Sequence, residues 1–202
     1  MRIYLIRHGQ TDMNAVHTID SYYPGASLSR LGQRQAAGLV GHFDGVPLGG
    51  IFVSNLVRTH ETAAPLAASR GLVPTELPGL REIEAGSWEG GSDAIAYDGY
   101  RSTIQRWVEG ALDERMGGGV SGAQVLERYD GAIAQIEASG VDEVAVVSHG
   151  GVIGFWTAMR VSGITLRLLA GREQTNAKMC VIEGSLAEGY RGLSCYGERI
   201  VA

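Results

Sequence analysis

Two short apolar runs, far apart in the sequence, end abruptly at polar clusters that contain histidine. Residues Ile3 to Ile6 precede Arg7-His8-Gly9-Gln10-Thr11, and residues Val144 to Val147 precede Ser148-His149-Gly150-Gly151. Continuous, largely β-branched runs of this length predict buried strands. Open α/β sheets bind their ligands at the carboxyl ends of the strands, so we expect the two histidines to share one crevice.

The segment after the first run has helical periodicity. Ser29 is expected to cap a helix in which Leu31, Leu39 and Phe43 form one apolar stripe, ending near Gly45. A second strand over residues 51–53 leads into an alanine-rich helix over 57–68, with Arg58 in its first turn. Alternation of strand and helix predicts parallel strand pairing.

The rest of the chain continues this alternation. We expect a short strand over 74–77, a loop over 80–91, a helix over 152–156, and two final strands over 179–182 and 193–196. Two helices separated by Gly117-Gly118-Gly119 are expected to form a cap insertion at about residues 92–136. The predicted fold is therefore α/β, a three-layer α/β/α sandwich with a mostly parallel central sheet and a helical cap over the strand carboxyl ends. Residues 1–202 are expected to form a single domain.

Composition narrows the function classes. The net charge of −5 disfavours nucleic acid and anionic membranes as partners and favours a small-molecule substrate. The sequence has no apolar stretch of membrane-spanning length, and the first strand leaves no room for a signal peptide, so a cytoplasmic location is expected. Cys180 and Cys195 lack metal-binding or redox spacing and are expected as two reduced thiols.

Four residues are candidates for phosphate chemistry. Arg7, His8, Arg58 and His149 all lie at predicted strand ends or helix starts, where they would form a cationic nest for a phosphoryl group. A neutral imidazole beside such a phosphate is a nucleophile, and His8 is the better candidate because it directly follows the strand. His149 is then the second donor to phosphate. A metal is not expected, because Arg7 would repel a divalent ion bound by His8.

The leaving alkoxide needs a proton, and the loop over 80–91 is the expected source. Glu82 is our candidate for the general acid, because this loop is partly apolar; Glu84 and Glu89 are substitutes. Assistance of this kind is worth roughly 10² to 10⁴ in rate.

Four sequence blocks together resemble the histidine phosphatase superfamily, also called the phosphoglycerate mutase-like family. They are Arg7 to Thr11 with Asn14, Ser54-Asn55-Leu56-Val57-Arg58-Thr59, Leu80-Arg81-Glu82 through Trp88-Glu89-Gly90, and Val147 to Gly151. The resemblance spans nearly the whole chain. It implies that His8 is phosphorylated, that Arg7, Arg58 and His149 hold phosphate, and that Glu82 donates the proton. It also implies neither a metal nor an organic cofactor.

The substrate-facing positions differ from the pattern of that family. Gln10 replaces a more usual glutamate, and Thr18-Ile19-Asp20-Ser21 stands where many members have Arg-x-Gln-Gly, which helps to hold an acidic substrate. Ser27-Leu28-Ser29 replaces Pro-Leu-Thr, and Gly119-Val120-Ser121 replaces Gly-Glu-Ser. These changes put ordinary phosphoglycerate recognition in doubt and leave the substrate open. We predict substrate contacts at five positions: Gln10, Thr11, Asn14, Trp88 and Gly150.

The remaining polar and aromatic residues receive plainer interpretations. His17, His42 and His60 are expected to be bystanders, with His17 nearest the substrate, and Asn176 is expected to stabilise a turn. The aromatic residues at 22, 23, 88, 97, 100 and 107 would suit a specificity pocket, although aromatics at helical spacing are more often core.

Three functions are compatible with these residues. The leading one is a phosphomonoesterase that hydrolyses a small phosphorylated metabolite through a phosphohistidine. A phosphoglycerate-type mutase is the alternative enzyme, and a non-catalytic phosphate-binding protein is a third reading that the presence of both His8 and Glu82 disfavours. A late edge strand offers a surface for a homodimer.

Overall fold

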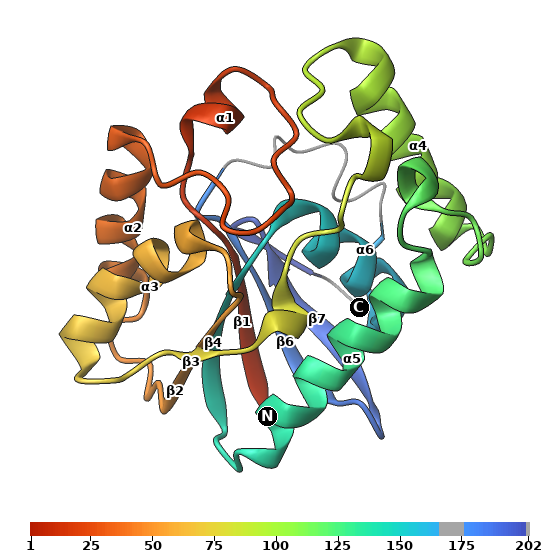
Figure 1. Ribbon diagram of the computed structural model, residues 1–202. Coiled ribbons are helices and arrows are strands. Elements are labelled where there is room, and N and C mark those ends of the chain that lie inside the picture. Colours follow the sequence, from red (N-terminus) through yellow and green to blue (C-terminus); the bar gives the residue numbers. More distant parts are fainter. Residues whose placement is uncertain (166–175, 201–202) are drawn as a thin grey trace.

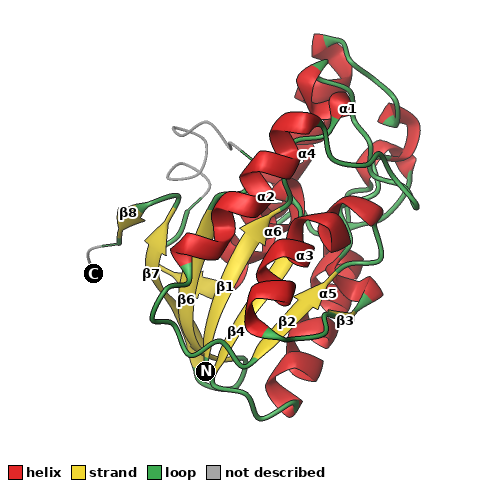
Figure 2. Cartoon of the chain, turned by 90° about the vertical axis from the view of Figure 1, so that its left-hand side faces the viewer, coloured by secondary structure: helices red, strands yellow, loops and turns green. Residues whose placement is uncertain are grey.

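The computed structural model describes residues 1–165 and 176–200. Within these ranges eight strands form one sheet in the order β3-β2-β4-β1-β6-β7-β5, with β8 paired to β7 at its edge (Figure 1). The strands are β1 (Arg2–Arg7), β2 (Gly50–Val53), β3 (Thr75–Glu76), β4 (Glu143–Ser148), β5 (Val161–Ser162), β6 (Met179–Ser185), β7 (Gly189–Cys195) and β8 (Glu198–Arg199). Figure 2 shows β8 beyond β7 on one side of the sheet and β3 on the opposite side.

The centre of the sheet is parallel, as the alternating pattern predicts. Strand β4 lies between β1 and β2 and pairs in parallel with both, and β2 pairs in parallel with β3. The late strands β6 and β7 add antiparallel pairs next to β1. The register places Arg7 opposite Ser148, so the carboxyl ends of β1 and β4 lie side by side.

Helices cover both faces of this sheet and give the predicted three layers. They are α1 (Asp12–Ala15), α2 (Arg30–His42), α3 (Val57–Arg70), α4 (Ala94–Val108), α5 (Gly122–Ala138) and α6 (Gly150–Arg160). Tyr4 and Ile6 of β1 share a core cluster with Leu39 of α2, whereas Leu5 of the same strand shares one with Ile133 of α5. Alternate residues of β1 therefore pack into opposite layers.

The loop after β3 and helix α4 stand over the carboxyl end of the sheet, whereas α5 packs on one face of it, so only the first part of the expected cap insertion lies over the strand ends (Figure 1). The two predicted helices are present, and the glycine triplet lies between them, partly in a short 3₁₀ turn over Met116–Gly118. Figure 1 shows α4 beyond the strand ends and α5 alongside the strands. Tyr129 of α5 belongs to the same apolar cluster as Val146 of β4, so this helix contributes to the layer on one face of the sheet.

The predicted apolar stripe of α2 is confirmed for Leu39 and Phe43, which are buried, and is wrong for Leu31. Leu31 is 40% exposed, and the residues that α2 buries are Gly32, Ala36 and Leu39. Ser29 caps the helix as predicted, with its hydroxyl accepting the N–H of Gly32, but the helix ends at His42. The side chains on the inner face of α2 are mostly small and give a weak hydrophobic signal. The sequence pattern therefore favours Leu31 as a core residue, although it is exposed.

The expectation of two reduced thiols is wrong. Cys180 of β6 and Cys195 of β7 are register partners with their Cα atoms 4.0 Å apart, and they are joined by a disulfide. Sequence spacing alone does not disclose that an antiparallel pair brings these two positions face to face. Along the described part of the chain, no helix combines the length and the apolar character needed to span a bilayer.

Candidate active site

The backbone of His8 is held from both sides at the end of β1. Its N–H donates to the carbonyl of Ser148 over 3.0 Å, and its carbonyl accepts from Nδ2 of Asn176 over 3.1 Å. The first contact joins His8 to the end of β4, and the second joins it to the segment that precedes β6. The histidine that the sequence places after a strand is thus fixed between two neighbouring strand ends.

Hydrogen bonding defines the tautomer of the His8 ring. Nδ1 lies 2.7 Å from the carbonyl oxygen of Gly9, which only accepts, so Nδ1 carries the proton. Nε2 therefore carries the lone pair, and it accepts a hydrogen bond from Nε of Arg58 over 3.1 Å. Burial lowers the pKa of His8 well below the ordinary value, and the charges of Arg58 and Arg7 lower it further. The ring is a neutral imidazole with a nucleophilic nitrogen facing Arg58.

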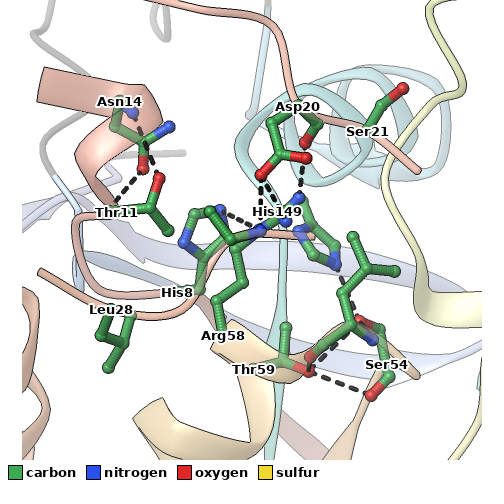
Figure 3. Close-up of polar contacts among 12 residues, drawn as sticks. His8, Thr11, Asn14, Asp20, Ser21, Leu28, Ser54, Arg58, Thr59 and His149 are labelled. Carbon is green, nitrogen blue, oxygen red and sulfur yellow. Dashed lines mark hydrogen bonds and ion pairs between the residues drawn. The ribbon is translucent and has the colours of Figure 1, made fainter. Parts of the chain in front are cut away.

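Arg58 lies in the first turn of α3 and is only 2% exposed. Its Nη1 is 3.3 Å from Oδ2 of Asp20, and its Nη2 donates to the carbonyl oxygen of the same residue over 2.8 Å. Burial lowers the pKa of Arg58, and the carboxylate of Asp20 opposes this shift. Figure 3 shows the guanidinium between His8 and Asp20, so three segments distant in sequence meet here.

His149 is the N-cap residue of α6 and lies next to His8. The ring centroids are 5.1 Å apart at an interplanar angle of 61°, and the His149 side chain is fully buried. Its Nε2 is 2.8 Å from Oγ of Ser54, whereas Nδ1 has no hydrogen-bond partner within the described ranges. Burial lowers the pKa of His149 well below the ordinary value, with Arg58 adding to the shift. Both imidazoles are therefore neutral, and one buried nitrogen is left for a ligand.

Arg7 and Glu82 lie within electrostatic reach of each other. Burial lowers the pKa of Arg7, and the charge of Glu82 counteracts this effect. Oε1 of Glu82 accepts from the N–H groups of Ile83 and Val152 at 2.9 and 2.8 Å, and Oε2 accepts from Gly151 at 3.0 Å. The Glu82 carboxyl group, the predicted proton donor, is thus anchored at the N-terminus of α6, where His149 is the N-cap residue.

The two substitute carboxylates are occupied elsewhere. Glu84 accepts from Nε of Arg81 over 2.8 Å. Glu89 accepts from the N–H of Ser21 over 2.8 Å and also from its hydroxyl group. The Glu89 contact ties the loop after α1 to the loop that carries Glu82.

The five predicted substrate contacts have mainly structural partners. Thr11 and Asn14 form a capping box at the start of α1, and the Gln10 side chain accepts from the Ser29 hydroxyl over 3.0 Å. Trp88 packs against the loop and α4, where a Cβ on Gly99 would come 2.7 Å from its ring. Gly150 is buried as the first residue of α6. These contacts do not test binding, so the five positions stay predictions.

Two site neighbours were missed by sequence reasoning. Asp20 lies in the segment noted for its departure from the family pattern, yet its contact with Arg58 depends on the path of the whole loop. Ser54 lies in the Arg58 block, and its bond to His149 crosses from β2 to α6. Asn176 stabilises the segment before β6, as expected, by donating to both His8 and Asn14. His60 pairs with Glu76 over 3.0 Å, away from the site.

The arrangement suits a tetrahedral anion. Guanidinium groups are planar donors that match phosphate oxygens, and a neutral imidazole such as that of His8 beside Arg58 has the chemistry of a nucleophile, with the ring of His149 close by. Within the described ranges, His, Cys, Asp and Glu side chains form no group of three or more placed to hold a metal ion.

Comparisons with known proteins point in the same direction. The family model described as "Histidine phosphatase superfamily (branch 1)" matches residues 3–190. Glucosyl-3-phosphoglycerate phosphatase of Mycobacterium tuberculosis is 33% identical over 169 residues, which are 78% of this chain and 74% of that protein. A probable phosphoglycerate mutase of Cronobacter sakazakii is 31% identical over 158 residues, 76% of this chain and 72% of that protein.

A third relative is similar over a shorter stretch. The PE-PGRS family protein PE_PGRS11 of Mycobacterium tuberculosis is 49% identical over 88 residues, and these make up 43% of this chain but only 15% of that protein. Among solved structures, a mycobacterial glucosyl-3-phosphoglycerate phosphatase in complex with VO3 superimposes with a TM-score of 0.80 at 27% identity, covering 98% of each chain.

Proposed function

The chain belongs to the histidine phosphatase superfamily, and from this membership and the geometry of its site we propose that it hydrolyses small phosphate monoesters through a phosphohistidine on His8. One observation carries the proposal. The lone pair of His8 Nε2 faces Arg58, because Nδ1 is committed to the carbonyl oxygen of Gly9 over 2.7 Å. A neutral nucleophile beside a fixed cation is the arrangement that phosphoryl transfer to histidine requires.

In the first step, Nε2 of His8 bonds to phosphorus while the bond from phosphorus to the ester oxygen breaks. The electron pair of that bond goes to the departing oxygen, which takes a proton from the Glu82 carboxyl group. Arg7, Arg58 and His149 hold the phosphoryl oxygens. The proton stays on Nδ1 of His8, and its hydrogen bond to the Gly9 carbonyl oxygen stabilises the positive charge that develops on the ring.

In the second step, water attacks the phosphohistidine. The Glu82 carboxylate accepts a proton from the water molecule, the new bond forms between oxygen and phosphorus, and the bond from phosphorus to Nε2 breaks with its electron pair returning to His8. Phosphate leaves and the enzyme is restored. No step needs a metal or an organic cofactor.

The proposal is tested by phosphate release from a panel of monoesters, ranked by kcat/KM. We expect His8→Ala to lower turnover by at least about 10³-fold and to abolish labelling of the protein by radioactive phosphate ester, measured after denaturation at alkaline pH, where the nitrogen–phosphorus bond survives. His60→Ala, which removes an exposed histidine paired with Glu76, is the matched control. Full activity in His8→Ala would refute the mechanism.

A phosphoglycerate-type mutase is the weaker alternative. Several relatives carry that name, including the one from Cronobacter sakazakii, but the full-length structural neighbour described above is a phosphatase. The two activities separate in one assay, since a mutase isomerises phosphoglycerate in the presence of a bisphosphate primer, whereas a phosphatase releases inorganic phosphate. A non-catalytic phosphate-binding protein would do neither.

The wider setting of the enzyme belongs to the same proposal. We propose a single domain over residues 1–202 with a cap at about 92–136, a cytoplasmic location, and partners that include neither nucleic acid nor membrane. The Cys180–Cys195 disulfide counts against the cytoplasm, because that compartment keeps most thiols reduced. Thiol titration of protein purified under alkylating conditions tests this point.

We also propose a homodimer, with light scattering as its test. The edge strands β3, β5 and β8 are each two residues long and offer few backbone groups for pairing. A dimer would therefore have to use side chains as well.

A further inference from the structure

The loop between α1 and α2 places a carboxylate against the arginine that the proposed reaction needs for phosphate. Oδ2 of Asp20 lies 3.3 Å from Nη1 of Arg58, and the same oxygen accepts from the N–H of Ala26 over 2.8 Å. The Asp20 side chain is 20% exposed, whereas that of Arg58 is 3% exposed. Asp20 is therefore anchored by the backbone on one side and borders solvent next to the site.

A second carboxylate is fixed close to the first. Glu89 accepts from the N–H of Ser21, the residue after Asp20, over 2.8 Å. The backbone of Ile19 exchanges hydrogen bonds of 2.9 Å with Gly90 and Gly91, so the two loops are joined along their length. The two acidic side chains thus belong to one rigid rim.

Carboxylates border the proposed phosphate position. Asp20 is the carboxylate with the largest effect on the Arg58 guanidinium, and Glu82 and Glu89 add to it, whereas Arg7 opposes them. Glu82 carries a proton when the ester binds in the proposed mechanism, so Asp20 and Glu89 are the charged carboxylates that a substrate meets there. The chain from His8 to Ser29 contains neither arginine nor lysine. A substrate that brings a second anionic group meets repulsion here, whereas a substrate that brings a cation compensates the carboxylates.

The position of the phosphate itself has independent support. Nδ1 of His149 is buried and unpartnered within the described ranges, and the ring of His149 stands 5.1 Å from that of His8. A phosphate bonded between these rings and Arg58 has Asp20 beside it. Two exposed aromatic side chains, Tyr22 and Tyr23, follow in the same loop.

We propose that Asp20 is a specificity-determining residue, and that the preferred substrates are phosphate monoesters with an ammonium group a few atoms from the ester oxygen. The inference rests on the proposed function, because it assumes that Arg58 and His8 bind the phosphate. Esters with a carboxylate at the same place are disfavoured.

Binding of phosphonates tests this without turnover, because their carbon–phosphorus bond is not hydrolysed. Calorimetry compares 2-aminoethylphosphonate, propylphosphonate and 3-phosphonopropionate, which are similar in size but cationic, neutral and anionic at the far end. We expect the parent protein to bind the amine about tenfold more tightly than the neutral ligand, and the carboxylate most weakly. In Asp20→Asn the ratio of amine to neutral affinity falls to within about threefold.

The control is Asp12→Asn, which removes the same charge from an exposed position in α1. It keeps the ranking of the parent protein. Comparing one ratio between variants cancels the differences in ionisation of the ligands. Asp20→Ser is the second variant, used if the melting temperature of Asp20→Asn is too low for calorimetry.

Each result decides the matter. Equal affinities in the parent protein, a preference for the carboxylate, an amine preference that survives in both Asp20 variants, or a failure of all three ligands to bind would each overturn the inference. Phosphate release from 2-aminoethyl phosphate is measured in parallel. If the ranking holds but no ester is hydrolysed, the proposed function fails and the role of Asp20 in binding stands.

Discussion

Nε of Arg58 donates a hydrogen bond to Nε2 of His8 over 3.1 Å, and both side chains are buried. This bond keeps the lone pair of the imidazole directed at the guanidinium. It has to break when Nε2 bonds to phosphorus, and Arg58 is then free to donate to a phosphoryl oxygen instead. The resting site thus already holds the nucleophile next to its cation, and the two groups separate to admit the phosphoryl group.

Glu82→Gln is expected to separate substrates by their leaving group. An alkyl phosphate needs a proton on its departing oxygen, so its turnover should fall about 10² to 10⁴-fold. Turnover of p-nitrophenyl phosphate should fall far less, since nitrophenolate leaves without a proton. Glu84→Gln, at a carboxylate bonded to Arg81, is the control. Equal losses on both esters would remove Glu82 from the role of general acid.

Stability should fall with acidification because of the two buried histidines. Burial holds the pKa of His8 and of His149 well below the ordinary value, whereas both titrate near about 6.5 in the unfolded chain. Above that pH neither state takes up a proton. Below it the unfolded chain is protonated first, so each histidine costs about 1.4 kcal/mol of stability per pH unit, until the lowered folded pKa is reached.

Urea denaturation between pH 8 and pH 5 checks this slope. His149→Gln should flatten the dependence in the acid range, and His60→Gln should retain the slope of the parent protein. Identical slopes in all three proteins would mean that His149 takes up its proton in the folded state.

Ser54→Ala should weaken both stability and catalysis. Oγ of Ser54 lies 2.8 Å from Nε2 of His149 and accepts from the N–H of Leu56 over 3.2 Å, and its side chain is fully buried. Leaving a buried ring nitrogen unpaired costs about 1 to 3 kcal/mol. Thermal melts and kcat/KM measure the two effects, with Ser69→Ala as the control because its hydroxyl bonds only within α3. An unchanged melting temperature would contradict this account.

Two glycines of α2 should respond to alanine in opposite ways. A Cβ at Gly32 would come 2.1 Å from the carbonyl oxygen of Gln10, whereas a Cβ at Gly38 would have no atom within 4 Å. Gly38→Ala should therefore stabilise the protein by about 0.5 to 1 kcal/mol, through helix propensity alone. Gly32→Ala should destabilise it by more than about 1 kcal/mol, because backbone must move. Denaturant midpoints compare the pair, and a stabilising Gly32→Ala would show that the segment carrying Gln10 yields easily.

The convergence of His8, Arg58 and His149 could be predicted because it follows from topology. Residues after neighbouring parallel strands meet at one edge of the sheet, and the first turn of the next helix starts at that edge. The strand positions required only short apolar runs bounded by polar residues. The histidine and arginine side chains at these positions therefore lie together at the edge of the sheet where ligands bind.

The contacts of Asp20 and the buried face of α2 could not be predicted in this way. Asp20 reaches Arg58 through a loop whose path depends on Ser21 and Glu89, which are 68 residues apart. Leu39 lies on the buried face of α2 as predicted, but the rest of that face is Gly32 and Ala36, which carry almost no hydrophobic signal, whereas the exposed Leu31 does. Long-range polar contacts and small buried residues leave no period in the sequence.

The double clamp on the His8 backbone has a consequence for the order of events. With its N–H on Ser148 and its carbonyl on Asn176, the His8 backbone is held at the end of β1, so the proposed phosphohistidine forms and breaks down at one place in the site. In-line displacement at the phosphohistidine then requires the incoming water to occupy the place that the alcohol has vacated. The alcohol therefore leaves before water enters, and the two molecules occupy the same position in turn.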